Sequence, residues 1–199
     1  MSKILVLCFV LLLSCKDSTS SLKSDFKEIK ESGFSIRIPN NMNPVYGENA
    51  NENAIIQYQN IFNETYFLII EDEKKDFVDT FKSIGEYDED LSIVENYMNV
   101  HLDSFHDTVD ILEEYNPSYL TINGLDAVSK EFDCTLEDVY EDITYFLTFV
   151  EGKEQVYMIM AWTLKDDKET HRTTFSKMAQ SFKLTGEKKK KKQNAKLRK

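Results

Sequence analysis

Residues 142–164, DITYFLTFVEGKEQVYMIMAWTL, decide the fold of this chain, because they hold two apolar runs on either side of Gly152-Lys153. Aromatic and β-branched residues fill both runs, and the short polar break between them is a turn signal. The pattern predicts an antiparallel hairpin with strands over residues 142–151 and 154–164. Because apolar residues occupy both faces of each run, these strands are expected at the centre of a sheet that helices cover on at least one side.

Shorter strands are predicted on both sides of this hairpin. Residues 34–38 alternate apolar and polar positions and end at Pro39, which is typical of a half-buried strand. Aromatic and β-branched runs bounded by turn residues predict the others, at residues 54–59, 64–70, 119–122 and 125–135. Asn123-Gly124 is the turn pair of a tight hairpin, whereas residues 40–53 have a loop composition.

Three helices are predicted from apolar residues that recur every three or four positions. The first carries Phe77, Val78, Phe81 and Ile84, with Gly85 as its expected C-cap. The second runs until Asn116-Pro117 along a stripe of Leu91, Val94, Met98, Leu102, Phe105, Val109 and Leu112. The third begins at Asp166 or Asp167 as N-cap and buries Phe175, Met178, Ala179 and Phe182. The order of elements predicts an α+β fold: one twisted antiparallel β-sheet with helices packed against it.

The first 14 residues are typical of a secretory signal peptide. Lys3 supplies a positive start, and the ten residues from Ile4 to Leu13 are all apolar. A membrane-spanning helix needs about 20 apolar residues, so this run is too short to span and has the length of a signal h-region. Leu12-Leu13-Ser14-Cys15 resembles the lipobox of bacterial lipoproteins. The resemblance implies cleavage before Cys15 and diacylation of its thiol; the alternative is a secreted protein with Cys15 left free.

The mature chain is therefore expected to have three parts. Residues 15–24 comprise the lipidated cysteine and a flexible, Ser-rich linker, residues 25–184 form the folded domain, and residues 185–199 form a basic disordered tail. Lys16 follows Cys15 where an aspartate would mark inner-membrane retention by enterobacterial sorting rules. By that resemblance, the outer membrane is the expected location if the source is Gram-negative.

The charge of the chain is unevenly distributed. The net charge is -11, yet the stretch from Lys188 to Lys199 holds eight basic residues and no acid. An acidic body argues against nucleic acid as the partner. Three interpretations of the tail stay open: contact with an anionic membrane surface, contact with a partner or nucleic acid, and a solubilising end attracted to the protein's own acidic body, which is slightly favoured.

Three motifs, in this order along the chain, resemble the PsbP/DcrB-like α+β proteins, a superfamily of photosystem II extrinsic subunits and many bacterial lipoproteins. They are Gly33-Phe34-Ser35-Ile36-Arg37-Ile38-Pro39, Gly124-Leu125-Asp126-Ala127 and Ser181-Phe182-Lys183. The first is similar to the opening strand of the family, the second leads into a long strand, and the third resembles the end of the terminal helix. The resemblance covers residues 26–184 and implies an accessory, scaffolding or chaperone-like role with no shared catalytic residues.

No catalytic residue, cofactor or metal is predicted. Cys134 lies beside Asp133 on a predicted strand and is expected to be a buried structural thiol, because nearby carboxylates disfavour the thiolate. His106 and Asp110 have the i, i+4 spacing of helical metal ligands, but amphipathic helices produce such pairs by chance. The acidic clusters at residues 71–73, 88–90 and 166–167 lack the form of a calcium loop, and acidic helix starts explain them more simply.

The expected function is that of a membrane-anchored lipoprotein acting as a non-enzymatic binding or accessory subunit of a cell-envelope complex. Its expected partners are the lipid bilayer, reached through acylated Cys15, and an envelope protein. Two alternatives belong to other functional classes. One is a carrier or receptor that holds a small ligand between helix and sheet, and the other is a hydrolase whose two carboxylates lie far apart in the sequence. A purely structural role remains open as well.

Overall fold

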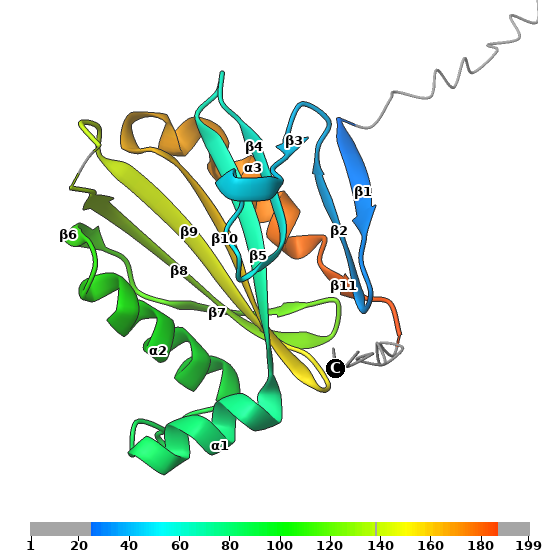
Figure 1. The fold of residues 1–199 in the computed structure, drawn as a ribbon, viewed down its shortest axis with the longest axis vertical. Helices are drawn as coiled ribbons and strands as arrows, with labels where there is room; N and C mark the ends of the chain where they lie inside the picture. The colour runs from blue at the N-terminus through cyan, green and yellow to red at the C-terminus, as the bar shows by residue number, and fades with distance from the viewer. Residues whose placement is uncertain (1–24, 138, 187–199) are drawn as a thin grey trace, which may run out of the picture.

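The computed structural model describes residues 25–137 and 139–186. The predicted signal peptide, Cys15, the linker up to residue 24 and the tail from residue 187 onward lie outside these residues. Within them, two antiparallel sheets and three α-helices form the predicted α+β fold (Figure 1). No α-helix in the described part of the chain is both long enough and apolar enough to cross a bilayer.

The main sheet has the strand order β3-β4-β5-β10-β9-β8-β6, and β7 also pairs with β8. Its strands are β3 (Asn43–Pro44), β4 (Ala54–Asn60), β5 (Thr65–Glu73), β6 (Asp110–Glu114), β7 (Ser118–Ile122), β8 (Leu125–Thr135), β9 (Ile143–Glu151) and β10 (Gln155–Leu164). The predicted central hairpin is confirmed, because β9 and β10 pair from Ile143↔Leu164 to Glu151↔Val156 and lie inside the sheet. The predicted hairpins β4–β5 and β7–β8 are also confirmed.

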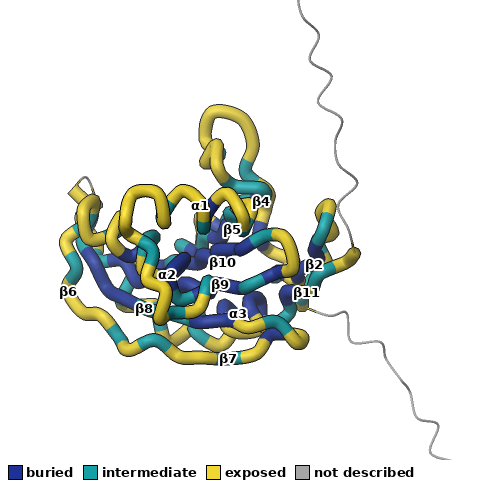
Figure 2. Tube along the Cα trace, turned by 90° about the horizontal axis from the view of Figure 1, so that it is seen from below, coloured by how far each residue is buried: buried dark blue, intermediate teal, exposed yellow. Residues whose placement is uncertain are grey.

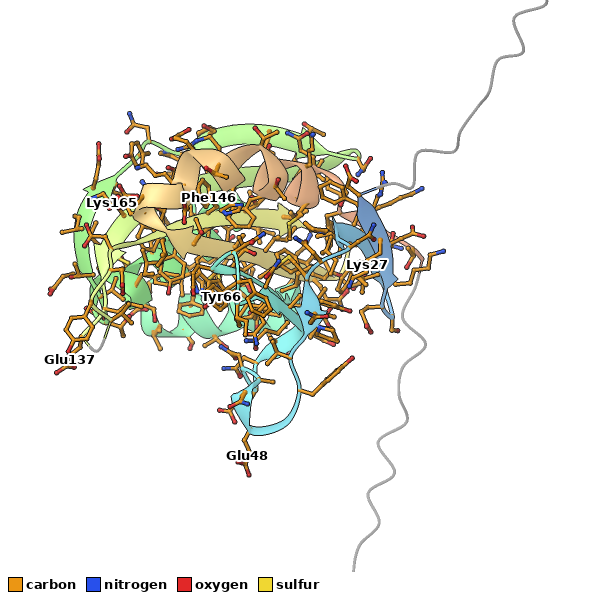
Figure 3. All side chains as sticks on the ribbon, turned by 90° about the horizontal axis from the view of Figure 1, so that it is seen from above. Lys27, Glu48, Tyr66, Glu137, Phe146 and Lys165 are labelled. Atoms are coloured by element: carbon orange, nitrogen blue, oxygen red, sulfur yellow. The ribbon has the colours of Figure 1, made fainter. Side chains whose placement is uncertain are left out.

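Helices cover both faces of the main sheet (Figure 3). On one face lie α1 (Lys74–Ile84) and α2 (Ile93–His106), and on the other lies α3 (Lys168–Gln180). Gly85 ends α1 in the left-handed conformation, with φ at 78°, as the sequence predicts. Asp167 precedes α3, but its side chain makes no capping hydrogen bond, so the predicted acidic cap is wrong in that respect. Short 3-10 turns occur at η1 (Gly47–Asn49) and η2 (Lys165–Asp167).

A second, three-stranded sheet forms one flank of the domain, and it was not expected as a separate unit. It has the order β1-β2-β11, with β1 (Phe26–Lys30), β2 (Phe34–Pro39) and β11 (Lys183–Leu184). The sequence predicts β2 from its alternating apolar residues. It does not predict β1, because FKEIK holds only two apolar residues and alternates weakly. The two ends of the described chain therefore lie on the same small sheet (Figure 1).

The second helix is shorter than predicted. It starts at a capping box formed by Ser92 and Glu95 and ends at His106, after which the chain turns into β6. Val109 and Leu112 continue the helical spacing by coincidence, and Leu112 is 49% exposed. Backbone pairing of β6 with β8 satisfies the hydrogen bonds that a longer helix would have made. Asp110 consequently lies on a strand and cannot form a helical i, i+4 pair with His106.

Two buried cores lie on the two faces of the main sheet (Figure 2). The core under α3 also fixes the small sheet, because Phe34 of β2 stacks on Phe182 at 5.3 Å between ring centroids and meets Tyr157 of β10 edge-on at 5.8 Å. Both Phe34 and Phe182 are fully buried. Removing a buried Phe side chain from such a core typically costs about 3–5 kcal/mol. The small sheet is therefore firmly attached to the rest of the domain.

Candidate functional site

A cleft of about 480 Å³ lies between α3 and the main sheet, and we call it the α3 cleft. The helix and the strands β5, β7, β8, β9 and β10 contribute its lining. The residues are Phe67, Tyr115, Asn116, Ser118, Tyr119, Leu120, Ser129, Lys130, Glu131, Phe146, Leu147, Thr148, Ile159, Ala161, Arg172, Phe175, Ser176, Ala179 and Gln180. The volume falls within the range of about 300–1,000 Å³ that is common for small-ligand sites.

Side-chain periodicity explains why these residues meet. Successive residues of a strand point to opposite faces, so Phe146 and Thr148 of β9 face α3 whereas Leu147 belongs to the core under α2. On α3, residues three and four positions apart share a face, which brings Phe175 and Ala179 toward the sheet. The result is a cleft with an apolar floor, and serine, threonine and amide side chains add polar groups to its lining.

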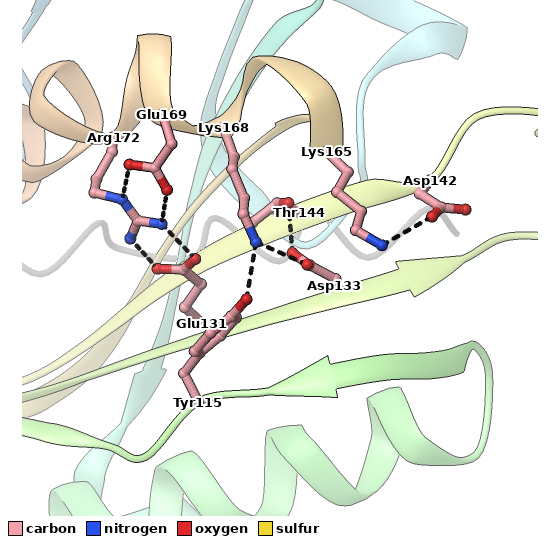
Figure 4. Close-up of polar contacts among 9 residues, drawn as sticks. All are labelled: Tyr115, Glu131, Asp133, Asp142, Thr144, Lys165, Lys168, Glu169 and Arg172. Carbon is pink, nitrogen blue, oxygen red and sulfur yellow. Dashed lines mark hydrogen bonds and ion pairs between the residues drawn. The ribbon is translucent and has the colours of Figure 1, made fainter.

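The charged side chains at one end of the cleft are paired with each other. Arg172 makes a two-pronged ion pair with Glu131, in which its Nη2 donates to Oε1 at 2.8 Å. The same guanidinium donates to Glu169 at 2.7 and 2.9 Å, and it lies 5.3 Å from the ring centroid of Phe146. The donors of Arg172 are therefore largely engaged (Figure 4). Glu131 is the single carboxylate in the lining of the cleft.

A buried polar network continues from this end of the cleft. Lys168 Nζ donates to Asp133 Oδ2 at 2.8 Å and to Tyr115 Oη at 2.9 Å, and Thr144 Oγ1 donates to Asp133 Oδ1 at 2.6 Å (Figure 4). Asp133 and Thr144 are fully buried. Burial alone would lower the pKa of Lys168, but its hydrogen bonds with Asp133 and Tyr115 raise that pKa above its ordinary value. The network fixes the start of α3 on β8 and β9.

The side chains that the sequence analysis considered for chemistry lie away from the α3 cleft. Cys134 is fully buried in the core under α2, and burial together with Asp133 raises its pKa to about 11, which keeps the thiol protonated. His106 Nε2 lies 3.0 Å from Glu114 Oε2, and not beside Asp110. Within residues 25–137 and 139–186, no group of three or more His, Cys, Asp or Glu side chains is arranged to hold a metal ion.

The acidic clusters have local structural partners in the domain. Asp72 accepts a hydrogen bond of 2.6 Å from the buried Tyr97 hydroxyl. Asp88 Oδ1 accepts from the backbone N–H of Asp90 at 2.9 Å and shapes the turn before α2. The first contact joins β5 to α2, and the second stabilises a turn.

The contacts between α3 and β8 were not predicted from the sequence. Glu131 and Asp133 are two residues apart, so they share one face of a strand, and Lys168 and Arg172 are four apart, so they share one face of a helix. Matched charges at these two spacings were the available signal. These matched charges identify a contact only when the face of the sheet that α3 covers is already known.

His101 gives a testable pH dependence. Its ring packs 4.5 Å from that of Tyr97 and 5.9 Å from that of Phe149, and burial lowers its pKa although Asp72 opposes the effect. Below pH of about 6.5 the unfolded chain binds a proton that the folded protein does not. The free energy of unfolding therefore decreases as the pH is lowered, by at most about 1.4 kcal/mol per pH unit. We expect urea unfolding of His101→Gln to show a shallower loss between pH 7 and pH 5. The exposed His106→Gln is the control, and equal slopes for His101→Gln and the unsubstituted protein would contradict the prediction.

Comparison with known proteins gives the fold of this chain. The sequence matches no family model, and no curated protein matches it. Among solved structures, cyanobacterial PsbP from Synechocystis aligns with a TM-score of 0.54 at 14% identity, over 87% of this chain and 99% of the other. LpqN, a protein involved in cell-envelope biogenesis of Mycobacterium tuberculosis, aligns with a TM-score of 0.50 at 10% identity, over 81% of this chain and 91% of the other. The domain therefore shares the α+β fold of cyanobacterial PsbP and of LpqN, and the PsbP-like fold predicted from the three sequence motifs is confirmed.

Proposed function

We propose that this protein is a lipid-anchored, non-enzymatic binding or accessory subunit of a bacterial cell-envelope complex. The observation that carries the proposal is the α3 cleft, which offers an apolar floor together with serine and amide groups to an occupant. Its one carboxylate, Glu131, is held by Arg172. General acid–base catalysis needs a group positioned to exchange a proton with the substrate, and a carboxylate already neutralised in this way suits binding better.

The location in the envelope is supported by the chain outside the described residues. A short apolar run followed by Leu12-Leu13-Ser14-Cys15 is the expected start of a lipoprotein. The shared fold with LpqN, a protein of cell-envelope biogenesis, is consistent with that location.

A second candidate function, a carrier or receptor for a small ligand, is favoured by the size of the α3 cleft. Because Arg172 and Glu131 neutralise each other, the ligand expected here is uncharged, with an apolar part and a hydrogen-bonding part. A thermal shift of the purified protein on addition of the neutral lipid fraction of the envelope would support this function. No shift with any neutral fraction would count against it.

A bulky side chain on α3 tests whether the cleft binds the partner. Ser176 lines the cleft and Thr173, also exposed on α3, does not. We expect Ser176→Tyr to reduce recovery of a stoichiometric partner from gently solubilised membranes at least about tenfold, the equivalent of about 1.4 kcal/mol. Thr173→Tyr is expected to recover the partner normally. Equal recovery by both variants would place the partner elsewhere, and substrate turnover by the purified protein that one point variant abolishes would overturn the non-enzymatic role.

A further inference from the structure

The basic residues of the domain gather where the two chain ends leave it. Residues 25–39 and 176–186, which form the small sheet and the end of α3, hold five basic and three acidic residues. Residues 40–175 hold eight basic and thirty acidic residues. The domain is therefore electrostatically polar, and an anionic surface would attract the small sheet while it repels the rest of the body.

Strand register places the cations of the small sheet together. Lys30 of β1, Ser35 of β2 and Lys183 of β11 form one cross-strand row, and Glu28 and Arg37 form the next. Arg37 is exposed, although Phe34, Ile36 and Ile38 of the same strand are buried. Glu28 is the single acid in these two rows, and Lys30 neutralises it at 3.0 Å. This face of the small sheet is consequently cationic.

A shallow hollow of about 260 Å³ lies beside this face, between β1, β2 and the end of α3. Arg37, Lys177 and Gln180 line it with donor groups, and Phe26 adds an aromatic ring, 6.0 Å from the Arg37 guanidinium. Its geometry is fixed, because the Arg37 backbone N–H donates to Ser181 Oγ at 2.8 Å and Ser181 Oγ donates to the Met178 carbonyl at 2.7 Å. An arginine beside a lysine, next to an apolar ring, is a combination suited to a phosphate group attached to an apolar body.

We infer that the hollow lined by Arg37, Lys177 and Phe26, with the surrounding face of the small sheet, docks on an anionic phospholipid bilayer by binding lipid phosphate groups. The inference deepens the proposed function, because it gives the anchored domain an orientation in which α1 and α2 lie away from the membrane (Figure 1). Ten residues separate Cys15 from Phe26, and a stretch of that length reaches at most about 33–36 Å. A protein anchored at Cys15 would hold the hollow near headgroups, so weak affinity for each headgroup is sufficient.

The test uses the mature chain with Cys15→Ser, which cannot be acylated, so its result does not depend on the lipid anchor. Its partition is measured onto phosphatidylcholine vesicles with and without phosphatidylglycerol. We expect binding only when phosphatidylglycerol is present, and about 30-fold weaker binding by Arg37→Gln/Lys177→Gln, from about 1 kcal/mol per basic residue near an anionic surface. Lys75→Gln/Lys82→Gln on α1 removes the same charge and is expected to bind almost normally, because α1 packs on the opposite face of the main sheet from the core that holds the small sheet.

Three outcomes would overturn the inference. They are absence of binding to phosphatidylglycerol vesicles, equal weakening by the two double variants, and normal binding by Arg37→Gln/Lys177→Gln. A further arm adds inorganic phosphate at constant ionic strength. Unchanged vesicle binding is expected, whereas displacement would identify a site for free phosphate and would also overturn docking on a bilayer. Thermal unfolding confirms that both double variants are folded. Lys30→Gln/Lys183→Gln is a second double variant on the same face of the small sheet.

Discussion

Replacing Lys168 with methionine is expected to lower the free energy of unfolding by about 3–5 kcal/mol, the usual cost of removing one partner from a buried ion pair. Asp133 is fully buried, and Lys168 is the cation that neutralises it, at 2.8 Å. Without Lys168, the carboxylate would keep the hydrogen bond from Thr144 but lose its counter-charge. Urea unfolding followed by circular dichroism measures the change.

A double variant shows whether the loss comes from the stranded charge. Asp133→Val/Lys168→Met removes both charges and is expected to recover at least half of the stability lost by Lys168→Met. Lys165→Met is the matched control, because Lys165 pairs with Asp142 at 3.1 Å and both side chains are about one third exposed. Exposed pairs contribute about 0–1 kcal/mol, so the control should be nearly neutral. If Lys168→Met lowers the free energy of unfolding no more than Lys165→Met does, then the ion pair with Lys168 does not stabilise Asp133.

The pH dependence of the same pair has a definite sign. The pKa of Lys168 is raised in the folded protein, so the folded state holds this proton more tightly than the unfolded chain does. The stabilisation from Lys168 is therefore complete below the ordinary lysine pKa of about 10.4 and is lost as pH rises through the higher folded pKa. The free energy of unfolding of Lys168→Met should therefore not show this loss at alkaline pH.

The elements that the sequence predicts correctly are those with local signals. The β9–β10 hairpin is specified by two apolar runs around Gly152, and the end of α1 is specified by Gly85. The end of α2 is predicted wrongly, because Val109 and Leu112 keep a helical spacing while β6 pairs with a strand that follows later in the chain. The preference for pairing with β8 is a tertiary effect that periodicity alone does not contain.

The α3 cleft is less predictable than the strands and helices around it. Its ion pair joins Glu131 and Arg172, which are 41 residues apart, and its floor combines strands from both halves of the chain. From the sequence, a ligand between helix and sheet is predicted only as an alternative function. Short-range patterns specify which side chains face inward, whereas the packing of α3 on the sheet decides which of them meet.

Replacing Cys15 with alanine is expected to move the protein from the membrane fraction to the soluble fraction or to leave it uncleaved. Two acyl chains give a stable anchor, whereas a single myristoyl chain gives an association constant of only about 10⁴ M⁻¹. Contacts between the small sheet and headgroups are weak and reversible by comparison, at about 1 kcal/mol per basic residue. Loss of the anchor should therefore lower the membrane-bound fraction at least about 100-fold at high salt, where those charge contacts are screened.

Fractionation at low and high salt, with mass spectrometry of the N-terminus, separates the two kinds of membrane contact. Cys134→Ala is the matched control, because this cysteine is buried in the domain and the variant should remain acylated and membrane-bound. Cys15→Ala that is normally processed and stays in the membrane at high salt would contradict the lipoprotein interpretation. Cys15→Ala that is released only at high salt would instead assign the remaining attachment to charge, and the Arg37→Gln/Lys177→Gln substitutions would then be expected to release it at low salt as well. The acyl anchor and the cationic face of the small sheet are thus two independent membrane contacts. The substitution at Cys15 tests the first, and the Arg37→Gln/Lys177→Gln substitutions test the second.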